Sequence, residues 1–229
     1  MTDKVNTQIK ETAIYTAGGW AVIIMLALMP VQAVIYMMYP PPATASGFFE
    51  LFAKNTLLGL ISTDLLYTVT NMLMILIYVP LYLILKKTNA SLSLLALILS
   101  VTGVAAYFSS VPAFEMLTLS GRYASATEPA NQAMFLAAGE TMLAQYTGTA
   151  YNAYYVLNAA ALLIFAYLMI KGGAFGKTGS IAALLAGFFM IIPASAGKLG
   201  LIFSFLSLIP YAVWLVIAAK VFFKQSAGK

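Results

Sequence analysis

The feature that most constrains this chain is a series of apolar stretches, each long enough to cross a lipid bilayer. A transmembrane helix needs about 20 predominantly apolar residues to span a hydrocarbon core of about 30 Å. Six stretches meet this requirement, at residues 13–38, 56–85, 90–111, 150–170, 179–197 and 199–219. Only 8% of the 229 residues are charged, whereas a soluble domain carries about 25%. The sequence predicts an all-α, polytopic integral membrane protein, a single six-helix bundle over residues 1–229.

The basic residues predict the orientation of the bundle, because Lys and Arg gather in the loops that stay in the cytoplasm. With the N-terminus inside, the inner segments hold Lys4, Lys10, Lys86, Lys87, Lys171, Lys177, Lys220, Lys224 and Lys229. The outer segments hold only Lys54, Arg122 and Lys198. We therefore expect a multi-pass protein of the inner (plasma) membrane with both termini in the cytoplasm.

The chain contains no histidine and no cysteine. It therefore has no imidazole metal ligand, no histidine general base, no thiolate nucleophile and no disulfide. No motif indicates a cofactor or a metal site, and an enzyme is the less favoured interpretation because no complete catalytic constellation is visible. The net charge of +5 does not indicate nucleic-acid binding, because the lysines lie where helices leave the bilayer. Membrane lipids are the expected partners, a small amphipathic ligand at the outer face is possible, and the sequence does not identify a protein partner.

Short amphipathic helices are expected on the outer side. Ser46 followed by GFFELFAK predicts a capped interfacial helix whose phenylalanines lie in the headgroup zone. The long outer connection over 112–149 contains Thr127-Glu128-Pro129, a helix start signal. We expect the amphipathic helix after it to lie over the outer mouth of the bundle. Its apolar face is expected to include Met134, Phe135, Ala138 and Met142.

Polar side chains inside the predicted spans are the main functional signal, because they are costly in a bilayer. In the second span, Asp64, Tyr67, Thr68 and Asn71 recur at i, i+3, i+4 and i+7, which is one helix face. In the fourth span, Tyr151, Tyr155 and Asn158 recur at i, i+4 and i+7, beside Tyr154. Both stripes fall in the outer half, whereas tyrosine is the only polar side chain in the inner segments MLMILIYVPLYLIL and AAALLIFAYLMI. The pattern predicts a polar cavity that opens outward and is sealed toward the cytoplasm.

Each polar feature also has a purely structural interpretation. Asp64 could be hydrated at the interface or paired with Lys198 or Lys54, and the tyrosines could form an aromatic belt at the membrane surface. Asn71 and Asn158 could make hydrogen bonds between helices. The outer charges could line or close the mouth of the cavity, or be solvated in loops. These charges are Glu115, Arg122, Glu140 and Lys198.

Three segments resemble a bacterial family of multi-pass membrane proteins, the domain-of-unknown-function 4386 family. They are NTLLGLISTDLLYTVTNMLMIL, SSVPAFEMLTLSGRYASAT and LAAGETMLAQYTGTAYNAYYVL, which lie between residues 55 and 158. The positions that carry the resemblance are Asp64, the run from Pro112 to Leu117, Ala138-Gly139 and Gly148-Thr149-Ala150. The resemblance implies a six-helix membrane fold and supplies no reaction.

Four functions remain open at this point. The favoured one is a protein that binds or senses a lipid, a peptide or a small amphipathic ligand in the outward-facing cavity. The second is a proton-coupled transporter of small molecules that uses Asp64 as the proton carrier. The third is an enzyme acting on lipid head groups through converging carboxylates, and the fourth is an assembly subunit whose polar stripes pair with a partner helix.

Overall fold

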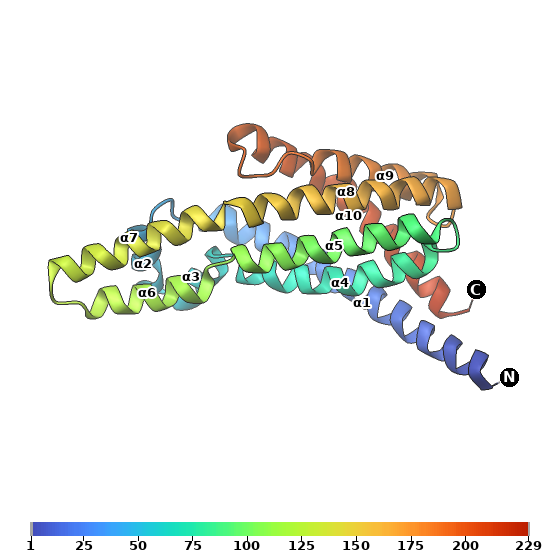
Figure 1. The fold of residues 1–229 in the computed structure, drawn as a ribbon, viewed down its shortest axis with the longest axis horizontal. Coiled ribbons are helices and arrows are strands. Elements are labelled where there is room, and N and C mark those ends of the chain that lie inside the picture. Colours follow the sequence, from blue (N-terminus) through green and yellow to red (C-terminus); the bar gives the residue numbers. More distant parts are fainter. Residues whose placement is uncertain (1, 229) are drawn as a thin grey trace.

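The computed structural model describes residues 2–228, and side chains from residue 11 to residue 228. This part of the chain forms ten helices and no strands (Figure 1). The helices are α1 (Thr2–Met38), α2 (Ala45–Lys54), α3 (Thr56–Ser62), α4 (Leu65–Leu85), α5 (Ala90–Ser110), α6 (Ala113–Ser125), α7 (Pro129–Tyr146), α8 (Thr149–Gly172), α9 (Gly176–Phe189) and α10 (Gly197–Ser226). The prediction of an all-α chain is confirmed.

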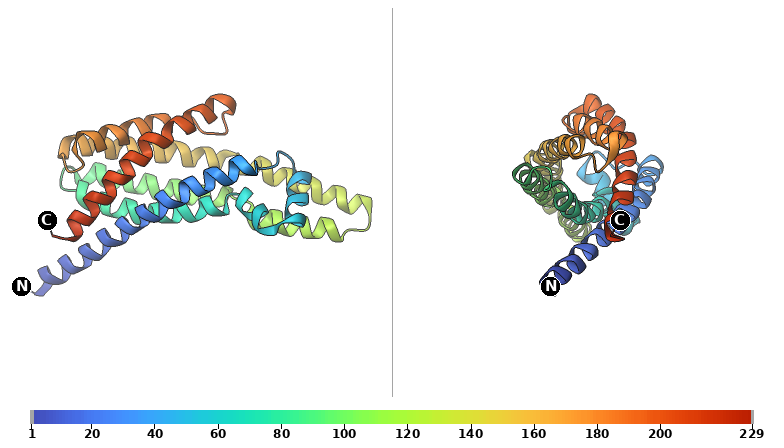
Figure 2. Two further views of the ribbon diagram at one scale, coloured as in Figure 1. Left: turned by 180° about the vertical axis from the view of Figure 1, so that it is seen from behind. Right: turned by 90° about the vertical axis from the view of Figure 1, so that its right-hand side faces the viewer.

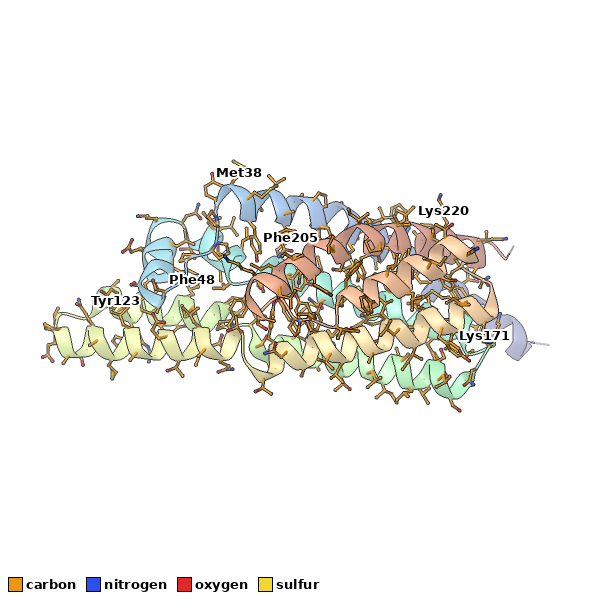
Figure 3. All side chains as sticks on the ribbon, turned by 90° about the horizontal axis from the view of Figure 1, so that it is seen from above. Met38, Phe48, Tyr123, Lys171, Phe205 and Lys220 are labelled. Carbon is orange, nitrogen blue, oxygen red and sulfur yellow. The ribbon has the colours of Figure 1, made fainter. Side chains whose placement is uncertain are left out.

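Six helices form a ring that is the body of the molecule. In the order α1, α4, α5, α8, α9, α10, each helix packs against the next, and α10 packs against α1 (Figure 2, right). Both termini lie at one end of the ring, which we call the terminal end. Figure 3 places Lys171 and Lys220 at this end. We call the opposite end, toward Met38 and Phe48, the distal end.

Five segments are long and apolar enough to cross a membrane. They are Glu11–Met38, Leu65–Leu85, Ala90–Ser125, Pro129–Gly172 and Gly197–Ser226. The helix predicted over 179–197 is shorter than expected, because α9 has 14 residues and ends at Phe189. At 1.5 Å per residue it is about 21 Å long, less than the hydrocarbon core. The structure therefore contains five helices that could cross a membrane and does not confirm the expected six.

The distal end carries a separate group of helices, α2, α3, α6 and α7. After a break at Val111 and Pro112, α6 follows α5, and after a break at Thr147 and Gly148, α8 follows α7 (Figure 1). As a result, α6 and α7 form a hairpin that projects beyond the ring, and α2 packs against both of its helices. We call α2, α6 and α7 the distal subdomain.

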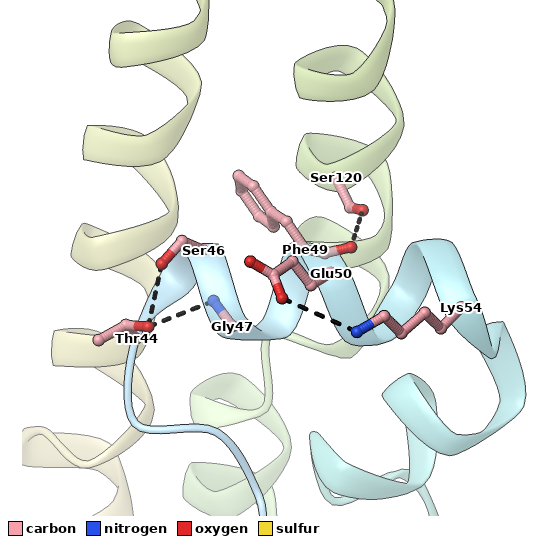
Figure 4. A network of polar contacts seen from close by, with 7 residues as sticks. All are labelled: Thr44, Ser46, Gly47, Phe49, Glu50, Lys54 and Ser120. Atoms are coloured by element: carbon pink, nitrogen blue, oxygen red, sulfur yellow. Dashed lines mark hydrogen bonds and ion pairs between the residues drawn. The ribbon is translucent and has the colours of Figure 1, made fainter.

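The apolar face of the predicted interfacial helix packs against protein. Phe48, Phe49 and Phe52 of α2 are buried with Met116 of α6. Thr44, not Ser46, caps α2, because its hydroxyl accepts a hydrogen bond of 3.2 Å from the Gly47 amide (Figure 4). The Ser120 hydroxyl of α6 donates to the Phe49 carbonyl, which ties the two helices together (Figure 4). An amphipathic helix has the same sequence pattern whether its apolar face meets lipid or another helix.

The helix predicted after Thr127-Glu128-Pro129 begins at Pro129 as expected. It runs along the line of α8 and does not lie across the end of the ring (Figure 1). Met134, expected on its apolar face, is 55% exposed, and the buried residue of this helix is Gly139. Gly139 lies against Ala45 and Phe49, where a Cβ atom would come within 2.8 Å of Ala45. The close approach of α2 therefore sets the orientation of α7.

The terminal half of the ring is filled with hydrocarbon. Leu81 and Leu85 of α4, Met169 of α8 and Trp214 of α10 belong to one core and are at most 1% exposed. Gly18 brings α1 close to α4, because a Cβ atom there would lie 2.5 Å from Cγ of Pro80. The polar stripes predicted from Asp64 to Asn71 and from Tyr151 to Asn158 lie toward the distal half of the ring.

Candidate functional site

The site begins with a break in the second apolar stretch. Asp64 separates α3 from α4 and has φ of 65° and ψ of 21°, the left-handed conformation. It is the one non-glycine residue with positive φ in the described chain, and aspartate tolerates this region better than most residues. The helix expected over 56–85 is thus two helices. The break turns the Asp64 side chain toward the interior of the distal end, where it is only 7% exposed.

Three tyrosines from three helices hold the Asp64 carboxylate. Tyr107 of α5 donates to Oδ2 at 2.9 Å, Tyr146 of α7 donates to the same oxygen, and Tyr36 of α1 donates to Oδ1. We call Tyr36, Tyr107 and Tyr146 the tyrosine cradle. Because Tyr146 belongs to the distal subdomain, the carboxylate joins this subdomain to the ring.

No basic side chain pairs with Asp64 within residues 11–228. The ion pairs in this part of the chain are Lys54–Glu50, at 4.0 Å, and Lys86–Glu11, at 3.8 Å. Pairing of Asp64 with Lys54 or Lys198 is therefore wrong, since Lys54 contacts Glu50 and Lys198 is exposed. A buried carboxylate normally requires a charged partner or a full set of hydrogen bonds, and here phenol hydroxyls supply the bonds.

A second set of tyrosines packs behind the cradle. Tyr67 of α4 and Tyr154 of α8 share a hydrogen bond of 3.2 Å between their hydroxyls, and Tyr151 donates to Tyr155 at 3.4 Å. The ring of Tyr107 lies 5.3 Å from that of Tyr67 and 4.9 Å from that of Tyr154, measured between centroids. Tyr154 and Tyr155 are 5% and 9% exposed, so they lie inside the bundle and do not form a surface belt.

The two asparagines play different parts. Asn158 joins two helices, because its Oδ1 accepts a 2.6 Å hydrogen bond from Tyr78 of α4 while its Nδ2 donates to the Tyr154 carbonyl of α8. Asn71 donates to the Tyr67 carbonyl of its own helix, and its Oδ1 is buried without a hydrogen-bond partner. Thr68 also bonds locally, with its hydroxyl donating to the Asp64 carbonyl at 3.0 Å. The helix-linking interpretation is thus confirmed for Asn158.

The outer charges do not join this cluster. Glu115, Arg122 and Lys198 are exposed, and Glu140 accepts a 2.8 Å hydrogen bond from the Ala45 amide at the start of α2. Within the described residues, no three Asp, Glu, His or Cys side chains lie close enough to hold a metal ion together. An enzyme acting on lipid head groups would need Glu115 and Glu140 to converge on Asp64, and they do not, so this hypothesis is not supported. The assembly subunit is also disfavoured, because the stripes face inward.

The sequence interpretation missed the whole cradle, Tyr36, Tyr107 and Tyr146. A signal was available, because each tyrosine lies in the last turns of a helix that ends shortly afterwards at a proline or glycine. These helix ends are all at the distal level, where Asp64 was also expected. Tyrosines at the ends of two expected spans and of the expected outer helix were therefore candidates for contact with an aspartate at the same depth.

The fold and this cluster define a helical, multi-pass membrane protein with a buried carboxylate near one end of its bundle. The chain matches the family model described as Domain of unknown function (DUF4386) over residues 16–223 and belongs to that family. No curated protein and no solved structure matches it.

Proposed function

We propose that this protein binds, and thereby senses, a small amphipathic ligand with a cationic group, using Asp64 as the anchor. The observation that carries the proposal is a buried carboxylate surrounded by tyrosines and without a basic partner in residues 11–228. In a low-dielectric site, a carboxylate attracts a positive charge far more strongly than it does in water. A cationic ligand would supply the counter-charge that the protein itself does not place there.

The rings around Asp64 support an organic ammonium ion as the cationic group. The negative faces of tyrosine rings attract cations, and several such rings around an anion suit alkylated ammonium groups. The ring of Tyr107, whose hydroxyl donates to the carboxylate, is in contact with the rings of Tyr67, Tyr151 and Tyr154. A hydrated metal cation would gain less from these ring faces, so the cluster favours an amphipathic ammonium compound.

Two residues of the cradle support entry from the distal end. Tyr36 and Tyr146 are half-buried, whereas Tyr107 is fully buried. Tyr36 is in the last turn of α1, just before the non-helical segment 39–44, and Tyr146 is the last residue of α7. A ligand that reached Asp64 would take the place of these two hydroxyls. The distribution of basic residues supports an extracytoplasmic position for the distal end and cytoplasmic termini.

The sensing part of the proposal rests on Tyr146. This hydroxyl ties α7 to Asp64, and α7 packs against α2 and α6. A ligand that displaces Tyr146 would loosen α7 from the ring and so change the distal subdomain.

The proposal is tested by thermal unfolding of the purified full chain in detergent, with hexyltrimethylammonium or choline added. At a hundredfold excess over Kd, a ligand stabilises the native state by about 2.7 kcal/mol, which we expect to raise Tm by about 5 °C or more. The uncharged analogue of choline, in which a carbon atom replaces the ammonium nitrogen, should not raise Tm. Asp64→Asn should abolish the shift, while Glu115→Gln, which changes an exposed carboxylate, should retain it. Equal shifts in the wild type and Asp64→Asn would refute the proposal.

A second candidate is proton-coupled transport with Asp64 as the proton carrier. It is favoured by the Tyr78–Asn158 hydrogen bond, which extends the buried polar groups along α4 beyond the cluster. At 1.5 Å per residue, Tyr78 lies about 21 Å along the chain from Asp64. Buried Leu81, Ile84 and Leu85 lie between Tyr78 and the terminal end, so a transported ion needs a conformational change there. Uptake into proteoliposomes that follows a pH gradient would support transport, and no flux under any gradient would exclude it.

A further inference from the structure

A groove outside the Asp64 cluster runs along the surface between α9 and α10. It has a volume of about 570 Å³. Its lining is almost entirely apolar, with Ile181, Leu185 and Phe189 from α9 and Leu206, Ile209 and Val213 from α10. Ile209 is 74% exposed, so the groove opens to the surroundings of the helices.

The groove lies where the two helices meet less closely than at its ends. Near the terminal end, Gly179 lies so close to α10 that a Cβ atom would be 2.8 Å from Cγ2 of Ile217. Near the distal end, the rings of Phe189 and Phe203 meet edge to face at 5.8 Å. Between these contacts, the lining includes the small side chain of Ala182, so the surface remains concave.

One end of the groove is polar and positively charged. Lys177 and Thr178, in the first turn of α9, line this end and are exposed. Lys177 takes part in none of the ion pairs within residues 11–228. Lys171 and Lys220 lie at the same end of the molecule (Figure 3).

The length of the groove matches one leaflet of a bilayer. The rise of α9 from Lys177 to Phe189 is about 18 Å at 1.5 Å per residue. Half of a hydrocarbon core of about 30 Å is about 15 Å. A hydrocarbon chain that begins at the membrane surface beside Lys177 would therefore reach about the middle of the bilayer at Phe189.

We propose that this groove binds one acyl chain of an anionic phospholipid, with the lipid phosphate against Lys177. The apolar lining accommodates the chain, and the unpaired ammonium group at one end fits a negative headgroup. A second copy of this chain would bring its own apolar helix and would not explain a lysine at the end of the groove. The site is separate from Asp64 and does not depend on the function proposed for it.

The test is native mass spectrometry of the full chain in detergent, with phosphatidylglycerol or phosphatidylcholine of identical acyl chains added. We expect the first bound lipid to favour phosphatidylglycerol about fivefold, the size expected for one basic residue at an anionic membrane surface. Lys177→Gln should remove this preference, whereas Lys171→Gln, outside the groove lining, should retain it. Ile181→Trp should fill the groove and reduce the first bound lipid of both kinds, whereas Leu184→Trp, on the same helix but outside the lining, should not.

Several results would overturn the proposal. If Lys171→Gln removes the preference as fully as Lys177→Gln, the preference belongs to the whole membrane surface. If Ile181→Trp folds and binds lipid like the wild type, the groove is not the site. A dimer that disappears on Ile181→Trp without any change in lipid binding would assign the groove to a second copy. Val213→Trp on α10 repeats the filling test from the other side, should Ile181→Trp not fold.

Discussion

Replacement of Tyr107 by phenylalanine tests the most buried bond in the cradle. The substitution removes one hydroxyl and keeps the ring, so the contacts with Tyr67 and Tyr154 remain and no large cavity forms. Tyr107 has no exposed surface, so water cannot replace the missing hydroxyl at Oδ2 of Asp64. We expect Tyr107→Phe to destabilise the fold because the carboxylate loses a donor without gaining another.

The magnitude follows from the charge of the acceptor. A hydrogen bond to a charged group contributes about 1.5–3 kcal/mol, and one between neutral groups about 1 kcal/mol. We therefore expect Tyr107→Phe to lower the free energy of unfolding by about 2 kcal/mol. Tyr39→Phe is the control, because Tyr39 is 51% exposed and its hydroxyl makes no hydrogen bond within residues 11–228. It should change the free energy of unfolding by less than about 0.5 kcal/mol.

The assay is denaturant unfolding in detergent micelles of Tyr107→Phe, Asp64→Asn and the double variant. Asparagine suits position 64 because it keeps the shape of the side chain and tolerates positive φ. If the hydroxyl and the carboxylate interact, the loss of unfolding free energy in the double variant should differ from the sum of the two single losses by at least about 1 kcal/mol. Additivity within about 0.5 kcal/mol would show that the two groups contribute independently and would refute the cradle.

Four further substitutions, at three positions, test the packing of the helices, each by the change in the free energy of unfolding. Gly103→Ala should cost about 1–3 kcal/mol, because its new Cβ atom would collide with Nδ2 of Asn158 where α5 meets α8. Gly121→Ala, in a helix with nothing within 4 Å of the new Cβ, should instead raise the free energy of unfolding by about 0.5–1 kcal/mol. A change of the same sign in both glycine variants would contradict the packing. Glu140→Ala should lower the free energy of unfolding by about 1 kcal/mol, because it leaves the Ala45 amide without its acceptor. Glu140→Gln should lower it less, because the amide oxygen of glutamine still accepts this hydrogen bond. Equal losses in the two variants would argue against capping of α2 by Glu140.

Long apolar runs predict helices well, because hydrocarbon length fixes what a bilayer can accommodate. The stretch expected over 90–111 is α5, Ala90–Ser110, and that over 150–170 is α8, Thr149–Gly172. The apolar terminal half was also predictable from the segments that hold tyrosine as their only polar residue. The predicted length of α9 was wrong, because hydropathy over 179–197 does not reveal that the helix ends at Phe189.

The break at Asp64 had no comparable signal. Ser62 and Thr63 precede it, but such residues are also frequent inside membrane helices, and a left-handed aspartate has no signature in hydropathy or periodicity. Within the predicted stripe, Asp64 and Asn71 are buried and Tyr67 is half-buried. The cradle was missed because its residues are far apart in sequence, and only the packing of α1, α5 and α7 around one point brings them together.

The distal subdomain illustrates a different limit. The pattern of Phe48, Phe49 and Phe52 correctly predicts a helix with one apolar face. It does not say which surface covers that face, and here the cover is Met116 and neighbouring residues of α6. Pairing between segments separated by a long connection is the part of a helical fold that local patterns leave open.

The proposed role of Asp64 as the anchor of a cationic ligand at the distal end of the bundle can be measured as binding. Its most direct test is equilibrium dialysis of radiolabelled hexyltrimethylammonium against the full chain in lipid nanodiscs, with wild type and Asp64→Asn side by side. We predict saturable binding near one molecule per wild-type chain and no saturable binding to Asp64→Asn above that of empty nanodiscs. Saturable binding of equal amount and affinity to both proteins would contradict the claim.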